Sequence, residues 1–104
     1  MQIVATKVYV RRVAKLLTED ERRAAEDEIT EDPLRWPVIQ GTGGLRKARA
    51  ARGSSGKSGG ARIIFYYWTS EGIIYLLTIY DKSSQSDLSA ADKKALRKIV
   101  ESLE

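Results

Sequence analysis

The residues best suited to chemistry in this sequence are cations gathered in its middle third. Between Pro33 and Ser70 the chain has seven Lys or Arg residues and no Asp or Glu, whereas the segments on either side each carry a slight excess of acid. The seven cations are Arg35, Arg46, Lys47, Arg49, Arg52, Lys57 and Arg62. All of the net charge of +4 therefore comes from this segment. A field of one sign on a small surface attracts polyanions, so nucleic acid is the first partner to consider.

The residue types that are missing narrow the chemistry further. The sequence has no His and no Cys, which removes the commonest general base and every thiolate ligand for a metal. Catalysis must therefore use Lys, Arg, Tyr, Asp or Glu, and we expect neither a metal nor another cofactor.

Composition and hydropathy also predict where the protein works. The absence of Cys fits a reducing compartment. The N-terminus lacks the charged leader and apolar core of a signal peptide, and no apolar run approaches the ~20 residues that cross a bilayer. We expect a cytoplasmic protein without a membrane partner.

The spacing of the cations predicts that two of them share one face of a strand. Alternation begins at Leu45, and a period of two places Lys47 and Arg49 on one face and Arg46 on the other. The glycine- and serine-rich loop at residues 52–60 follows, and its composition predicts mobility. We expect Arg46, Arg52 and Lys57 to add contacts to RNA.

The elements that must position these residues can be predicted along the chain. With 104 residues, the chain is long enough for one domain, 1–104. Gln2–Ala5 is expected to be an edge strand, and apolar residues spaced by three and four predict a helix over residues 7–17. A capping box at Thr18 begins a second helix that runs to about residue 30 and ends before Pro33.

The second half of the chain is predicted to supply the sheet. Residues 61–68 and 73–80 are rich in β-branched and aromatic residues, and the turn between them favours a hairpin. Because both strands are apolar at nearly every position, we expect them to lie centrally, with helices on one face and a concave site on the other. Ser89 caps a last helix. The order β-α-α-β-β-β-α is an α+β arrangement with a mostly antiparallel sheet.

Three strings in this order resemble the RelE/HigB family of toxin–antitoxin toxins. They are VIQGTGGLRKAR at residues 38–49, GGARIIFYY at residues 59–67 and YLLTIYDK at residues 75–82. The resemblance covers nearly the whole chain. It implies a RelE/ParE-like fold and a metal-independent endoribonuclease that cleaves messenger RNA in the ribosomal A site. It further implies a cognate antitoxin, for which we expect a HigA-like DNA-binding protein.

The resemblance also assigns residues. Lys47 and Arg49 match the paired cations of the family's first basic strand, Arg62 matches its phosphate-holding arginine, and Lys82 matches the cation after its last strand. Such a site needs a base, a charge clamp and a proton donor. Crowded cations depress the pKa of a lysine, which would make Lys47 a usable base, while arginine stays charged and forks onto phosphate.

The proton donor is the part of the pattern that this chain does not reproduce. Several family members have an arginine directly after the Lys82 position and a tyrosine near position 89, where this chain has Ser83 and Ser89. Tyr80 is the substitute we consider first, although a buried core tyrosine fits its position equally well.

Other interpretations stay open at this point. In one interpretation, the cations are only the solvated face of a basic protein. In another, the protein is a plain RNA-binding module. A ParE-like toxin that acts on DNA gyrase would share the fold without cleaving RNA. Tyr66 and Trp68 are favoured as core residues over base-stacking ones.

Overall fold

The computed structural model describes residues 1–53, 60–83 and 87–103. Its helices are α1 (Lys7–Leu16), α2 (Glu19–Glu31), the short 3-10 turn η1 (Pro33–Arg35) and α4 (Ala90–Leu103). Its strands are β1 (Gln2–Ala5), β2 (Arg46–Ala50), β3 (Ala61–Trp68) and β4 (Ile73–Asp81). The predicted order of elements is confirmed, with element ends shifted by one residue at most.

The described strands form a single sheet in the order β1-β4-β3-β2. β1 pairs with β4 in parallel at one edge, whereas β2, β3 and β4 are antiparallel to one another. The hairpin strands β3 and β4 are thus central, as predicted. This is the α+β architecture with a mostly antiparallel sheet that the sequence indicated.

The two N-terminal helices cover one face of the sheet. Tyr9 and Val13 of α1 and Ile29 of α2 are at most 1% exposed and belong to the same core cluster as Phe65 and Leu76. β2 contributes two small residues to this cluster, Ala48 and Ala50, and both are buried.

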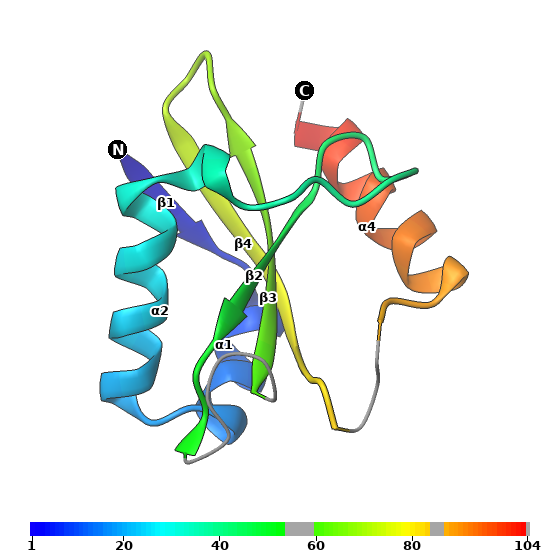
Figure 1. The fold of residues 1–104 in the computed structure, drawn as a ribbon. Coiled ribbons are helices and arrows are strands. Elements are labelled where there is room, and N and C mark those ends of the chain that lie inside the picture. The colour runs from blue at the N-terminus through cyan, green and yellow to red at the C-terminus, as the bar shows by residue number, and fades with distance from the viewer. Residues whose placement is uncertain (54–59, 84–86, 104) are drawn as a thin grey trace.

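α4 covers much of the opposite face, on which the sequence predicted a concave site. Figure 1 shows α2 and α4 on opposite sides of the sheet. Leu96 and Val100 of α4 are buried with Leu45, Ile64 and Leu77 in a second cluster. Strands that are apolar on both faces need cover on both, which leaves only the ends of the strands for polar residues.

Capping boxes begin two of the helices. Thr18 Oγ1 accepts a hydrogen bond from the Glu21 N–H, and the Glu21 carboxylate accepts one from the Thr18 N–H. Ser89 and Asp92 make the same reciprocal pair at the start of α4. Both predictions of capping are confirmed.

A tight turn sets the start of β2. Gly43 and Gly44 have φ values of 76° and 109°, a region that residues with a Cβ rarely adopt. Thr42 is fully buried in this turn, and its hydroxyl donates to the Ile39 carbonyl and accepts from the Leu45 N–H. The turn therefore delivers Leu45 to the core and fixes the phase of the cations that follow.

No helix in the described part of the chain is long and apolar enough to span a membrane.

The capping box of α2 gives a direct test of this fold. Thr18→Ala removes an acceptor for the Glu21 N–H, and we expect a loss of about 1 kcal/mol in the free energy of unfolding. Urea denaturation followed by circular dichroism measures it. Thr69→Ala, in the exposed β3–β4 turn, is the matched control and should change stability little. Equal effects of the two substitutions would contradict the assignment.

Candidate active site

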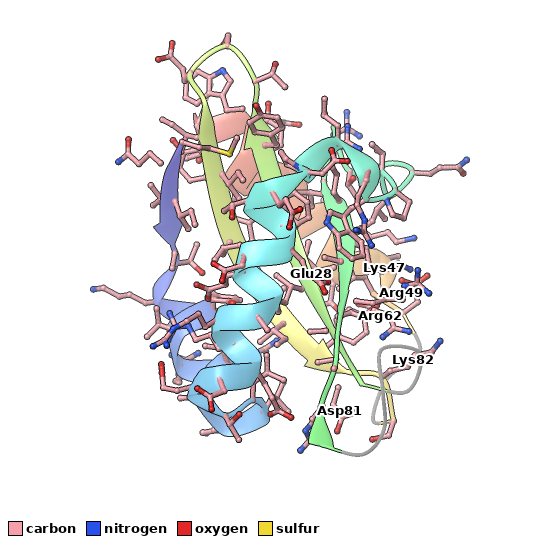
Figure 2. The ribbon with its side chains drawn as sticks, turned by 60° about the vertical axis from the view of Figure 1, so that its left-hand side comes forward. Glu28, Lys47, Arg49, Arg62, Asp81 and Lys82 are labelled. Atoms are coloured by element: carbon pink, nitrogen blue, oxygen red, sulfur yellow. The ribbon has the colours of Figure 1, made fainter. Side chains whose placement is uncertain are left out.

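Three neighbouring strands bring a row of polar side chains together at one end of the sheet. Arg49 of β2 is the register partner of Arg62 of β3, and Arg62 is the partner of Tyr80 of β4. Directly opposite residues point to the same face, so the three side chains form one cross-strand row. Lys47, two residues before Arg49, lies on the same face, and Figure 2 shows Lys82 beyond the row toward the end of β4.

A β-bulge puts Tyr80 into this row. Phe65 pairs with Leu76 and Ile64 pairs with Thr78, so Leu77 is the extra residue in β4. Without it, Ile79 would face Arg62 and Tyr80 would point to the opposite side of the sheet. Bulges often redirect side chains beside active sites. No pattern in the sequence indicates this bulge.

The members of the site differ in how firmly they are held. Arg62 is 6% exposed, and one of its terminal nitrogens donates to the Ala61 carbonyl at 3.2 Å. Arg49 and Lys82 are exposed, and Lys47 is partly buried. The site therefore combines one fixed guanidinium with three cations that can reach a ligand from solvent.

An acid that the sequence did not indicate also lies at this site. Asp87 lies just before α4, and its Oδ1 is 3.6 Å from Lys47 Nζ. Its neighbour Leu88 is buried in the core cluster under α4, which fixes this segment against the sheet. No pattern in the sequence links Asp87 to β2, because the contact depends on where α4 packs.

The presence of Asp87 weakens the case for Lys47 as a base. That hypothesis required a neighbourhood of cations alone, in which like charges repel each other. The anion 3.6 Å away removes this premise. Lys47 remains available as a positive charge for phosphate.

Tyr80 belongs both to the core and to the site. The residue is 4% exposed and packs in the cluster under α4, while its hydroxyl is buried with no hydrogen-bond partner among the described residues. Burial raises the pKa of Tyr80, the negative charge of Asp87 raises it further, and Arg62 opposes them. The phenol therefore keeps its proton at neutral pH and can donate it.

Two cations expected to bind RNA lie elsewhere and support the fold. Arg46 pairs with Phe65 on the face of the N-terminal helices and donates to the carbonyls of Leu34 and Trp36. Arg52 donates to the Leu16 carbonyl at 2.9 Å and forms an ion pair with Asp81. The structure does not bring either guanidinium to the cross-strand row.

Other expected contributors can be placed as follows. Lys57 and most of the predicted mobile loop lie outside the described residues. Tyr66 is 9% exposed and Trp68 packs against the core cluster under α4, which favours their core role over base stacking. The described residues contain no group of three or more acidic side chains that could hold a metal ion.

Comparison with known proteins places this geometry in a family. The sequence model of one protein family, the RelE toxin of the RelE/RelB toxin–antitoxin system, matches residues 1–104. The chain belongs to the RelE toxin family. The RelE assignment confirms the part of the sequence-based resemblance that named RelE.

Solved RelE structures share the fold. A mutant of the E. coli toxin RelE in the free state is 14% identical with a TM-score of 0.59, over 82% of this chain and 86% of that one. The E. coli RelBE toxin–antitoxin complex is 13% identical with a TM-score of 0.57, covering 77% and 94%. The archaeal RelE–RelB complex from Pyrococcus horikoshii OT3 is 22% identical with a TM-score of 0.52, covering 78% and 93%.

The structural role of the Asp81 site can be tested by pH. Hydrogen bonds from the Ser83 N–H and hydroxyl lower the pKa of Asp81 below its ordinary 3.8, and Arg52 adds to this. A lowered pKa contributes stability above the unfolded value and loses it as pH falls through the folded value. We therefore expect Asp81→Asn to lower the urea midpoint at about pH 7 and to lose less than wild type at about pH 3.

The matched control for this RelE-family protein is Asp27→Asn, an exposed carboxylate on α2. Its midpoint should follow that of wild type at both pH values. An Asp81→Asn midpoint equal to wild type at neutral pH would mean that the ion pair with Arg52 and the Ser83 hydrogen bonds add nothing to stability.

Proposed function

We propose that this RelE toxin is a ribosome-dependent endoribonuclease that cleaves messenger RNA in the A site and so inhibits translation. The observation that carries the proposal is the cross-strand row of Arg49, Arg62 and Tyr80 with Lys47 beside it. A row of cations with one buried proton donor suits a phosphodiester that must gain charge and release an alkoxide.

The reaction begins with attack of a ribose 2′-OH on the adjacent phosphorus and ends with release of the 5′-oxygen. The pentavalent transition state carries additional negative charge on its phosphoryl oxygens. Buried Arg62 supplies one guanidinium for this charge, and exposed Arg49 supplies a second. Lys47 and Lys82 add positive charge along the RNA backbone.

Tyr80 is the proton donor in this proposal. Tyr80 is the register partner of Arg62, and its hydroxyl is buried and keeps its proton because its pKa is raised. Tyr80 would thus replace the arginine and tyrosine that other family members have where this chain has Ser83 and Ser89. The reaction needs no metal, and we propose that none takes part.

The partners follow from the same function. The ribosome and its messenger RNA supply the substrate, so we infer that the protein works in the cytoplasm. A cognate antitoxin silences it. Two of the solved relatives are complexes of RelE with RelB, whereas nothing in the comparisons supports the HigA-like partner expected from the sequence.

Transcript mapping tests this function most directly. Brief induction of the protein should arrest growth and produce new 5′ ends in phase with translated codons. Loss of DNA supercoiling without new ends would indicate a ParE-like gyrase poison instead. RNA binding without growth arrest would indicate a plain binding module. Unchanged growth from a folded, well-expressed protein would contradict the toxin activity itself.

Arg62 provides the sharpest residue-level test. Arg62→Ala should lower single-turnover cleavage on programmed ribosomes by about 10²–10³, because it removes a donor aimed at transition-state charge. Arg62→Lys should recover only part of the rate, since an ammonium cannot make the two-pronged contact.

Arg23→Ala is the matched control, because Arg23 is exposed on α2 away from the row. It should cleave at the wild-type rate. Arg62→Ala cleaving as fast as Arg23→Ala would remove Arg62 from the site, provided that circular dichroism shows both variants folded.

A further inference from the structure

Asp87 is the acid that the structure brings to the cationic end of the sheet. It approaches from the segment that leads into α4, where buried Leu88 anchors the chain against the strands. The Asp87 side chain is 51% exposed, so a ligand lying on the row can reach it. The acid is therefore both fixed in place and accessible.

Charged and titratable groups from three elements face Asp87. Lys47 of β2 lies 3.6 Å from its Oδ1. Tyr80 of β4 and Lys93 of α4 interact with it electrostatically. Lys47, Lys93 and Tyr80 thus face Asp87, and Arg62 is the register partner of Tyr80.

RNA cleavage needs a proton acceptor as well as positive charge, and the cations alone supply only the charge. Lys47 and Arg62 are positively charged and attract phosphate, but neither is free to accept a proton while charged. Tyr80 holds its proton. Two carboxylates lie at this end of the sheet: Asp81 is held by Arg52 and Ser83, whereas the Asp87 carboxylate lies beside Lys47 and is ionised at neutral pH.

We propose that Asp87 is the general base of this site, with Lys47 as the positioning residue that holds its carboxylate toward the RNA. This inference rests on the proposed endoribonuclease function and assigns its missing proton acceptor. Carboxylates of Asp and Glu are among the side chains that act as general bases, and the sequence has no histidine for this role.

The step balances between Asp87 and Tyr80. The 2′-hydroxyl gives its proton to an Asp87 oxygen as its oxygen forms a bond to phosphorus. The bond from phosphorus to the 5′-oxygen breaks, and its electron pair leaves with that oxygen, which takes the Tyr80 proton. The products are a 2′,3′-cyclic phosphate and a 5′-hydroxyl. Transfer of the proton from Asp87 to the phenolate, through water, restores the enzyme.

The pH dependence separates this base from a lysine. The Leu88 N–H lowers the pKa of Asp87 below its ordinary 3.8, and Lys47 and Lys93 lower it further. The carboxylate is ionised above that value, so the wild-type rate should be constant between about pH 6 and pH 9. With an ordinary lysine as base, pKa about 10.4, the rate would rise about tenfold per pH unit over this range.

Single-turnover cleavage on programmed ribosomes tests the assignment. Asp87→Asn should lower the rate constant by about 10²–10⁴, the range that general bases contribute. Ribosome binding should stay equal or become tighter, because the substitution removes a negative charge from a site for phosphate. Asp87→Glu should recover part of the rate with the same flat pH profile. Asp27→Asn, on the surface of α2, is the matched control and should cleave like wild type.

Each result decides between outcomes. If wild type cuts no RNA on ribosomes, the proposed function fails and this inference fails with it. If wild type cuts and Arg62→Ala does not, but Asp87→Asn stays within about threefold of wild type, Asp87 is only an anion paired with Lys47 and the inference alone is wrong. If Asp87→Asn does not fold, the wild-type pH profile decides: a rate that rises with pH overturns the assignment.

Discussion

The arrangement of the helices is determined by the two central strands, because both of their faces must be shielded from water. β3 and β4 are apolar at nearly every position, so neither face can be left to water. α1 and α2 satisfy one face and α4 the other, which confines polar chemistry to the ends of the strands. The cross-strand row lies where β2, β3 and β4 approach such an end. A rigid core therefore continues directly into the candidate site, and burial of Arg62 and Tyr80 follows from this continuity.

Register is the second determinant of the site. Pairing of Arg49 with Arg62 places two cationic residues directly opposite each other, and like charges in such a pair are destabilising. The bulge at Leu77 then turns Tyr80 to the same face. The closeness of Arg49 and Arg62 would therefore cost stability in the free protein and favour phosphate in the proposed complex.

Much of this fold follows from the sequence, because its signals are local. Capping boxes at Thr18 and Ser89, the stop at Pro33 and the period-two spacing of Lys47 and Arg49 each depend on residues close together in the chain. The missed features depend on contacts between distant segments. Asp87 meets Lys47 only after α4 packs, and Arg52 reaches Asp81 only after β2 and β4 have paired with β3. A charged residue in a basic segment gives no indication of whether a carbonyl of its own chain will bind it.

The alternation along β2 separates two ways in which such a protein can lose its activity. Lys47 and Arg49 project toward the row, while Ala48 and Ala50 lie flat beneath the N-terminal helices. Insertion of a single residue before Lys47 would exchange the two sets and press cations into a core built for methyl groups. Such a frame-preserving lesion destroys the folded protein itself. In the proposed site, replacement of Lys47 or Arg49 would instead remove a charge for RNA and leave the folded surface that a partner recognises.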